Sequence, residues 1–404
     1  MLENPCFEHA RDVLLSAVSP VGSESVSLSA CVGRILSDDL IAEKNVPAFD
    51  RTPYDGYAFR SADTEGASRS RPVFLRILEE IPAGGVSHIP VSSGTAVKVL
   101  TGAPIPEGAD AVINYELTEF TEKEVTLFHP VTPGSNIVFV GEDVKKGSVL
   151  APKGLFIDAG TVGTLAAQGV TAPMVYRKLR VAVISTGSEL VEPWEEPGEG
   201  MIRNSNAYTI SAALQENGFE AVYLGIARDT AEDIAGLIEK GLHECDALIS
   251  TGGVSVGDYD MTPAAMDLCA VEQLVRGVRL KPGQACSYGV RAEKLMCGLS
   301  GNPASCMTNL YTVAMPALRK MAGWRTPVPE LIDITMKNGF PKSSKDTRVL
   351  RGRLCLTGGR VEMELPPKQG NVILSSTVGC DAMAIIPAGN GPVEPGTTLK
   401  GFMV

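Results

Sequence analysis

The sequence lacks the marks of several protein classes. None of its nine cysteines forms a CxxC motif, and their odd number and wide spacing argue against a disulfide framework and indicate reduced thiols in the cytosol. Its four histidines stand far apart along the chain, so no zinc motif is present. Any bound metal is therefore expected to be a hard cation held by carboxylates.

Clusters of basic residues and long apolar segments are also absent. The formal net charge is −11, and without a run of Lys and Arg the sequence argues against nucleic-acid binding. An acidic chain of this kind binds an anion only through a local cationic pocket. No apolar stretch reaches membrane-spanning length and none resembles the core of a signal peptide, so we expect a cytoplasmic protein without membrane partners.

The sequence does contain clear changes of pattern along its 404 residues, which are too many for one ordinary core. Residues 46–140 are dense in Pro, Gly and short apolar runs, which predicts a β-rich module with long loops. From residue 178, apolar strands alternate with amphipathic helices, which predicts an α/β domain with a parallel sheet. Residues 328–404 return to β-branched runs and predict a second β module.

Three strand ends in the α/β region share one design. The strings VISTGSEL (183–190) and LISTGGVSVGD (248–258) each end a strand in Ser-Thr-Gly before an acid, and GLSGNPASC (298–306) leads into a helix. Ligands of open parallel sheets bind at the carboxyl ends of strands, where Gly allows close approach and helix N-termini attract anions. One such loop is ordinary turn chemistry, but three favour a phosphate or nucleotide pocket. Neither GxxxxGK[ST] nor GxGxxG occurs, which excludes a P-loop and gives no support for a dinucleotide fold.

Charged side chains follow these strand ends. The acids are Glu189, Asp229, Asp258 and Asp260, and such acids can hold Mg²⁺ between themselves and phosphate oxygens. The alternative for Asp229 is that it only caps the following helix. Lys281 lies beside a Pro-Gly turn and is suited to pair with an anion, although a lone Lys is usually solvated.

Eight strings, which follow one another over nearly the whole chain, resemble the molybdopterin molybdenumtransferase family of MoeA-like proteins and the gephyrin E domain. In chain order they are FDRTPYDGYA, LTGAPIPEGADAV, GEDVKKG, ISTGSEL, IRNSN, ISTGGVSVGDYD, LKPG and LSGNPAS. The resemblance implies the last step of molybdenum cofactor assembly. Molybdate is inserted into the dithiolene of molybdopterin, and adenylyl-molybdopterin is hydrolysed with release of AMP and the assistance of Mg²⁺.

The resemblance also implies a fold of the multidomain α/β plus β class and an elongated homodimer. Its active cleft would lie between the α/β domain and the β modules of the partner subunit, and a MogA/MoaB-type adenylyltransferase would be a transient partner. The implied domains are an extended linking domain (19–45 and 141–177), a β-rich loop module (46–140), a MogA/MoaB-like α/β domain with a parallel-rich sheet (1–18 and 178–326) and a C-terminal β-barrel-like module (327–404).

Roles for individual residues follow from the matching motifs. Catalytic roles fall to Asp55, Thr101, Asp143, Glu189, Asp229 and Asp260, of which Glu189, Asp229 and Asp260 would hold Mg²⁺. The strand ends and motifs together give the substrate-binding set Ser250, Thr251, Gly252, Gly253, Ser255, Asp258, Lys281, Ser300, Gly301, Asn302, Ser305 and Arg351. Lys281, Ser305 and Arg351 match positions near molybdate, with Ser375 or Ser376 beside the Arg.

Two departures from the family pattern stand out. Many members read KPGKP where this chain has KPGQA, so Gln284 replaces a lysine and the anion site has one charge less. Many members also read MDGYA where Tyr54 precedes the Asp here, which indicates a packing change. Alternative functions are a tungstate-inserting paralogue, a non-catalytic scaffold and a nucleotide amidohydrolase on the same α/β fold. The β-module motifs argue against the amidohydrolase, because they have no role in it.

Overall fold

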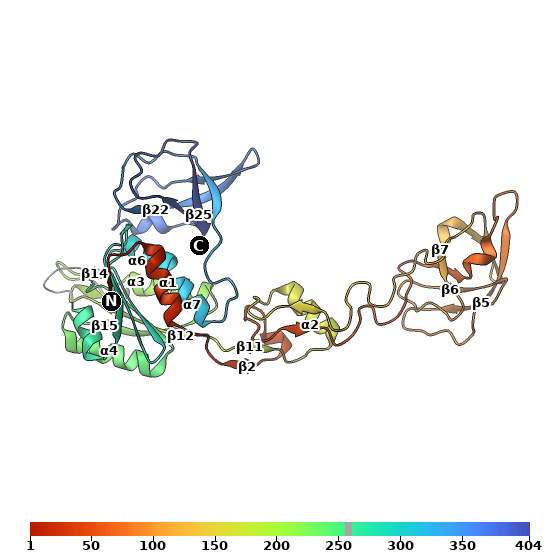
Figure 1. The fold of residues 1–404 in the computed structure, drawn as a ribbon, viewed down its shortest axis with the longest axis horizontal. Coiled ribbons are helices and arrows are strands. Elements are labelled where there is room, and N and C mark those ends of the chain that lie inside the picture. Colours follow the sequence, from red (N-terminus) through yellow and green to blue (C-terminus); the bar gives the residue numbers. More distant parts are fainter. Residues whose placement is uncertain (255–260) are drawn as a thin grey trace. The chain divides into compact units, whose positions relative to one another are not determined.

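The computed structural model describes residues 1–254 and 261–404, and its chain divides into two compact units. Unit 1 comprises Met1–Asp38, Lys153–Ala159 and Ala172–Val404, and unit 2 comprises Asp39–Pro152 and Gly160–Thr171. Figure 1 labels the helices and strands of both units along the chain. The predicted multidomain α/β plus β fold is confirmed by the sheets of these units.

Unit 1 contains a mixed seven-stranded sheet in the order β1-β17-β19-β20-β16-β12-β15. Its strands are β1 (Leu2–Glu3), β12 (Arg180–Thr186), β15 (Glu220–Ala227), β16 (Ala247–Thr251), β17 (Glu272–Arg276), β19 (Cys286–Arg291) and β20 (Lys294–Leu299). Strands β20, β16, β12 and β15 run parallel, as predicted. Strand β19 runs antiparallel to both of its neighbours, and a two-residue hairpin turn with positive φ angles at Ala292 and Glu293 leads from it into β20.

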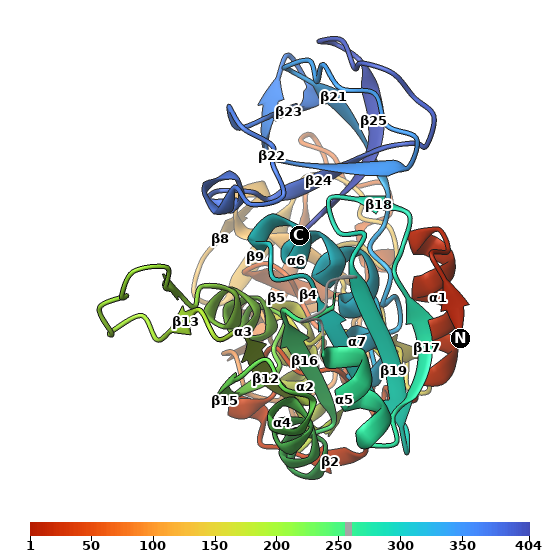
Figure 2. The same cartoon turned by 90° about the vertical axis from the view of Figure 1, so that its left-hand side faces the viewer.

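Helices cover both faces of this sheet. They are α1 (Phe7–Ala17), α3 (Asn206–Glu216), α4 (Ala231–Glu244), α5 (Thr262–Leu268), α6 (Pro303–Asn309) and α7 (Met315–Met321), with a π-helical segment η4 (Leu310–Ala314) between the last two. Side chains alternate along β12, so Val183 packs in the core cluster that includes α1, α3 and α7, whereas Ile184 packs against α4 and α5. Figure 2 shows α4 and α5 together on one face.

The C-terminal part of unit 1 is a closed barrel. Its strands are β21 (Ile332–Met336), β22 (Thr347–Thr357), β23 (Arg360–Glu364), β24 (Ala382–Ile386) and β25 (Thr398–Met403), and η5 (Leu374–Thr377) is a short 3₁₀ helix. The ring closes because β22 pairs with both β23 and β24, while β21 and β25 complete the circuit. The predicted barrel-like module is therefore present.

The barrel is joined to the α/β domain by backbone pairing and by a shared core. Strand β18 (Leu280–Lys281) pairs with the start of β22, so that Lys281 lies across from Arg348. Val349, Met383 and Phe402 of the barrel belong to the same apolar cluster as the helices of the α/β domain. This arrangement holds the loops at the end of the sheet against the barrel.

Unit 2 contains a six-stranded sheet in the order β7-β4-β6-β5-β9-β8. Its strands are β4 (Gly56–Phe59), β5 (Val73–Ile81), β6 (Thr95–Val99), β7 (Ala111–Asn114), β8 (Thr118–Phe120) and β9 (Glu124–Leu127), and the 3₁₀ helices are η2 (Ser61–Thr64) and η3 (Tyr115–Leu117). Most short turns between them are polar or rich in Gly, as the composition of 46–140 predicts.

Short ladders from the predicted linking segments fall in both units. Strand β2 (Ser23–Ser25) pairs with β11 (Met174–Tyr176) in unit 1, near the 3₁₀ turn η1 (Leu28–Ala30). Strand β3 (Leu40–Ile41) pairs with β10 (Val149–Ala151) in unit 2. Helix α2 (Ala159–Gln168) lies in the second linking segment, and in unit 1 a further short ladder pairs β13 (Leu190–Val191) with β14 (Ile202–Arg203). In the described part of the chain, no helix has both the length and the apolar character needed to cross a membrane.

Gly323, which follows α7, provides a test of packing in unit 1. Its φ is +85°, and a Cβ atom there would lie 2.1 Å from the ring of Tyr176. Gly33 has a similar φ of +77° but nothing within 4 Å of the same position. We expect Gly323→Ala to lower the free energy of unfolding by roughly 1–3 kcal/mol more than Gly33→Ala, since only the first adds a clash. Equal losses in thermal unfolding would contradict the contact.

Candidate functional site

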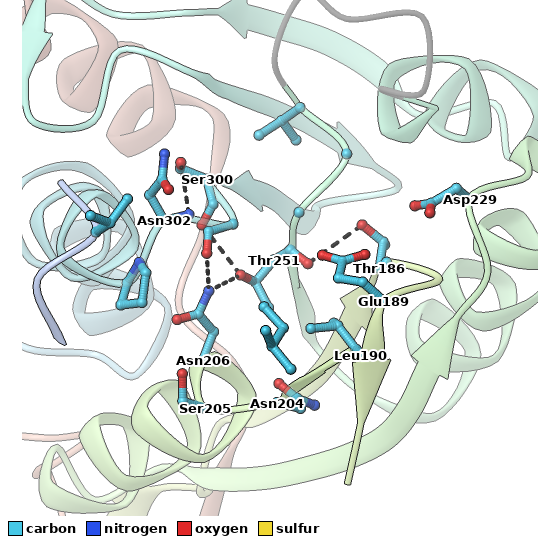
Figure 3. Close-up of a pocket in the computed structure, with 18 of the residues that line it drawn as sticks. Thr186, Glu189, Leu190, Asn204, Ser205, Asn206, Asp229, Thr251, Ser300 and Asn302 are labelled. Atoms are coloured by element: carbon cyan, nitrogen blue, oxygen red, sulfur yellow. Dashed lines mark hydrogen bonds between the residues drawn. The ribbon is translucent and has the colours of Figure 1, made fainter. Parts of the chain in front are cut away.

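Residues from three strand ends surround one pocket with a volume of about 620 Å³, which we call the strand-end pocket. The ends of β12, β16 and β20 meet at one edge of the sheet because these strands are parallel neighbours. They contribute Thr186, Gly187 and Glu189; Thr251, Gly252 and Gly253; and Ser300, Gly301 and Asn302. Figure 3 shows Glu189 and Asp229 at one side of this pocket and Ser300 and Asn302 at the other.

The Gly-Gly pair after β16 has a steric reason. Gly252 and Gly253 adopt φ angles of +100° and +64°, which favour glycine. A Cβ atom on Gly252 would lie 2.4 Å from the carbonyl oxygen of Thr186, and one on Gly253 would lie 2.8 Å from the Thr262 hydroxyl. Only glycine therefore lets the loop after β16 approach the end of β12, and it places the backbone of this loop in the pocket lining.

Asn206 links two of these loops. It is the first residue of α3, and its side-chain amide donates to the Thr251 hydroxyl and to the Gly301 carbonyl, both at 2.8 Å. The Thr251 hydroxyl in turn donates to the Ser300 carbonyl at 3.3 Å. These bonds fix the shape of the pocket wall that Figure 3 shows around Asn206.

Asn206 was missed as a site residue from the sequence, together with its neighbours Arg203, Asn204 and Ser205, which also line the pocket. The segment RNSN has the composition of a polar entry into a helix, which accounts for it without a ligand. The sequence did contain a feature that could have identified these residues, because the polar run lies between one strand-end loop and the helix that packs beside it. Asn204 is buried and accepts from the Ser185 hydroxyl at 3.1 Å, so it supports the strand end itself.

Two carboxylates line the strand-end pocket, those of Glu189 and Asp229. Asp229 accepts a hydrogen bond from the backbone N–H of Ser188 at 2.8 Å. Thr230 is the N-cap of α4, with its hydroxyl accepting from Asp233 N–H at 3.2 Å. The alternative role of Asp229 as the cap is thus taken by its neighbour.

These carboxylates suit Mg²⁺, which typically takes one or two protein carboxylates and completes its octahedron with water and phosphate oxygens. Over the residues that the structure describes, no group of three or more His, Cys, Asp or Glu side chains is arranged to hold a metal. A cation here would therefore depend on the substrate for further ligands. Ser255, Asp258 and Asp260, which were predicted for this site, lie outside the described residues.

A second pocket of about 400 Å³, which we call the cationic pocket, lies between the α/β domain and the barrel. It shares Ala285, Ser300 and Asn302 with the strand-end pocket. Its other lining residues are Leu280, Lys281, Pro282, Gly283, Gln284, Ser305, Lys342, Arg348, Gln369, Gly370 and Asn371. Three of its side chains are cations and none is a carboxylate, a composition that favours an oxyanion.

Arg351 lies behind the wall of the cationic pocket and is fully buried. Its Nη2 donates to the Ser376 hydroxyl at 3.0 Å and to the Gly370 carbonyl at 3.4 Å, and the Gln369 amide donates to the Arg351 carbonyl. Nη1 is buried without a hydrogen-bond partner among the described residues, and burial lowers the pKa of the guanidinium. Of the two serines predicted beside Arg351, Ser376 is the one in contact.

Ser250 does not reach the strand-end pocket. It is completely buried inside β16, and its hydroxyl has no hydrogen-bond partner in the described structure. Side chains alternate along a strand, so Thr251 faces the pocket while Ser250 does not. The prediction that Ser250 touches substrate is therefore corrected. Ser305, in contrast, lines the cationic pocket together with Lys281.

Three predicted residues belong to unit 2. The backbone N–H and the hydroxyl of Thr101 both donate to Asp55, at 2.6 and 2.7 Å. These two bonds lower the pKa of the Asp55 carboxyl. Asp143 donates its backbone N–H to the Val46 carbonyl at 3.0 Å, and no hydrogen bond joins it to Asp55 or Thr101 among the described residues. The structure thus pairs Asp55 with Thr101, whereas Asp143 is not hydrogen-bonded to either in the described residues.

Replacing Thr101 tests this pairing. We expect Thr101→Val to raise the pKa of Asp55 part of the way back to its usual value, because the hydroxyl is lost while the backbone N–H remains. Thr101→Ser, which keeps a hydroxyl, is the matched control and should leave the pKa low. The titration of the Asp55 carboxyl by nuclear magnetic resonance measures both. An unchanged pKa in Thr101→Val would show that the hydroxyl does not donate to Asp55 in solution.

Family models match the chain in three consecutive segments. Residues 6–169 match the model described as the MoeA N-terminal region (domain I and II). Residues 182–320, which include both loops with the string Ile-Ser-Thr-Gly, match the model described as "Probable molybdopterin binding domain". Residues 333–400, which form most of the barrel, match the MoeA C-terminal region (domain IV).

Whole-chain relatives are similar over nearly the full length. The molybdopterin molybdenumtransferase of Staphylococcus epidermidis is 35% identical over 379 residues, which cover 93% of this chain and 90% of that protein. The enzyme of the same name from Staphylococcus aureus is 34% identical over 388 residues, 96% of this chain and 92% of the relative. The crystal structure of the molybdopterin biosynthesis moeA protein from Pyrococcus horikoshii OT3 is 31% identical, with a TM-score of 0.86 over 99% of this chain and 100% of that one.

Proposed function

The chain belongs to the MoeA family of molybdopterin molybdenumtransferases, transferases of molybdenum cofactor biosynthesis, and on that premise we propose that it inserts molybdate into molybdopterin, hydrolysing adenylyl-molybdopterin and releasing AMP. The observation that carries this proposal is the adjacency of two chemically different pockets. The strand-end pocket offers two carboxylates and a glycine backbone in its lining, and the cationic pocket offers positive charge. They share Ala285, Ser300 and Asn302.

The strand-end pocket suits the phosphate part of adenylyl-molybdopterin. Gly252 and Gly253 leave backbone accessible, and Asn206 fixes the loops that face the ligand. Glu189 and Asp229 would hold Mg²⁺ against phosphate oxygens. When bound, that ion neutralises charge on the phosphoanhydride. The residues of the chain position the bond and its attacking water, and no covalent nucleophile is needed.

The cationic pocket suits molybdate, a tetrahedral dianion. Lys281 and Ser305 line it with the amides of Asn302 and Asn371, which can donate to oxygens that the lysine does not reach. Arg351 adds a positive charge behind the wall. Because the pocket adjoins the strand-end pocket, an anion bound here lies next to a substrate bound there. Tungstate has the same charge and shape, so the same pocket fits a tungstate-inserting enzyme.

The remaining parts of the proposal rest on the family. We infer a homodimer in which Asp55, Thr101 and Asp143 of one subunit complete the cleft of the other. We also infer a cytoplasmic enzyme that receives its adenylylated substrate from a MogA/MoaB-type adenylyltransferase. A substrate with a labile anhydride is best passed directly between enzymes, which favours transient contact. The scaffold and amidohydrolase alternatives have no observation in their favour.

Removing the paired carboxylates tests the hydrolytic step. We expect Asp229→Asn and Glu189→Gln each to raise the Mg²⁺ concentration for half-maximal AMP release by roughly tenfold or more. Loss of a residue that only supports a metal ligand typically costs about 10- to 100-fold in metal affinity, and loss of a ligand itself should cost no less. Folding should be retained, because the amide oxygen that Asp229→Asn introduces can still accept from the Ser188 N–H. The readout is AMP released from adenylyl-molybdopterin in the presence of molybdate, with thermal unfolding measured alongside.

Glu199→Gln is the matched control, since Glu199 is exposed and lines neither pocket. It should leave the Mg²⁺ dependence unchanged. An unchanged Mg²⁺ dependence in Asp229→Asn and Glu189→Gln would remove these acids from the metal site. An unaltered protein that releases no AMP when molybdate and Mg²⁺ are both present would contradict the proposed function itself.

A further inference from the structure

Arg348 is the cation of the cationic pocket that the rest of the site leaves unexplained. Of the three cations that line this pocket, Lys281 is paired with Asp346 at 3.4 Å, whereas Arg348 and Lys342 form no ion pair with any described residue. The Arg348 guanidinium lies over the ring of Phe340, 5.2 Å from its centroid. Its Nε atom is buried and has no hydrogen-bond partner in the described part of the chain.

A buried donor without a partner is destabilising, and such groups call for an explanation. Burial lowers the pKa of Arg348, which means that the surroundings disfavour the charged form. A guanidinium nevertheless keeps its proton under ordinary conditions. An anion in the pocket that Arg348 lines would compensate this charge.

The fold places Arg348 beside the predicted molybdate-binding lysine. In the parallel ladder of β18 and β22, Lys281 is the direct partner of Arg348, and paired residues of neighbouring strands project to the same side of a sheet. Gln284 lines the same pocket from the loop after β18. Gln284 is uncharged where the resemblance to the family implies a lysine, and Arg348 on the barrel places a cation in the same pocket.

We propose that Arg348, assisted by Lys342, is an oxyanion-binding residue that supplies to molybdate the positive charge that Gln284 does not carry. This inference rests on the proposed function, because it assigns a residue to the anion of that reaction. The planar guanidinium can donate to two oxygens of a tetrahedral oxyanion through its Nη atoms, which unlike Nε are not buried. Lys342 is exposed and adds charge at the rim, where its contribution is smaller.

The direct test is equilibrium binding of inorganic molybdate to the full-length protein, measured by calorimetry without pterin. We expect Arg348→Gln to weaken molybdate binding roughly tenfold or more, as for the loss of a charge-assisted hydrogen bond. Tungstate binding should weaken equally, since it has the same charge and shape. Lys345→Gln is the matched control, because Lys345 lies in the segment just before β22, is exposed and does not line the pocket.

A rescue experiment separates charge compensation from general damage. Adding Gln284→Lys to the Arg348→Gln variant should restore most of the lost molybdate affinity, because it returns a cation to the other wall of the same pocket. Arg348→Lys keeps the charge and is expected to bind more tightly than Arg348→Gln. Thermal unfolding shows whether Arg348→Gln folds. If it does not, molybdate binding by Arg348→Lys is compared with that of the unaltered protein instead, because this variant tests the loss of the planar guanidinium.

The inference is overturned if Arg348→Gln binds molybdate like the unaltered protein while Lys281→Gln loses binding, since the pocket would then work without Arg348. Molybdate binding needs neither pterin nor AMP release. If the unaltered protein binds molybdate and Arg348→Gln does not, Arg348 binds an oxyanion. This conclusion holds even if the protein releases no AMP, because that result contradicts only the proposed function. No molybdate binding by the unaltered protein would overturn this inference, whatever the AMP assay shows.

Discussion

The site depends on one steric constraint, the close approach of the Gly252 backbone to the carbonyl of Thr186. Parallel strands bring their ends to the same edge of a sheet, but side chains would ordinarily keep the loops apart. Two glycines with positive φ remove that barrier, and Asn206 then joins the loop after β16 to the loop after β20. The glycine backbone in the pocket lining and the wall that Asn206 holds in place follow from this packing.

The cationic pocket depends on a different feature, the joining of the barrel to the sheet domain. Strand β18 pairs with β22, and the backbone N–H of Ala304 in α6 donates to the carbonyl of Asn371 at 3.0 Å. These contacts bring cations from distant parts of the sequence into one space. Charges of like sign would repel one another there, so their assembly is stable only when fixed by backbone pairing or neutralised by an anion.

Much of this arrangement could be predicted from the sequence, because strand ends and glycine turns are local signals. The string Ile-Ser-Thr-Gly and the alternation of strands and helices place the loops after β12 and β16 at one edge. What could not be predicted has a physical reason in each case. The direction of β19 relative to β20 is set by a hairpin turn at Ala292 and Glu293, and this turn contains no Gly or Asn from which it could be predicted.

Side-chain direction and long-range contact set the other limits. Ser250 and Thr251 differ only in which face of β16 they occupy, and the motif itself does not say which. Asn206 looks like part of a helix start, and Arg348 stands in a segment without any motif. The role of Asn206 as a link between two loops, and the place of Arg348 in the pocket, required the fold that brings separate segments together. Arg351 was found through resemblance, whereas its contact with Ser376 required the structure.

The shared core of the barrel and the sheet domain has a consequence for motion. Val349, Met383 and Phe402 are buried in the same cluster as the helices of the α/β domain, so swinging the barrel away would expose apolar surface to water. That cost opposes separation of the barrel from the sheet domain. The pterin and the metal oxyanion would therefore meet at a spacing built into the folded chain, and any opening or closing that admits them must come from loops or from other parts of the protein.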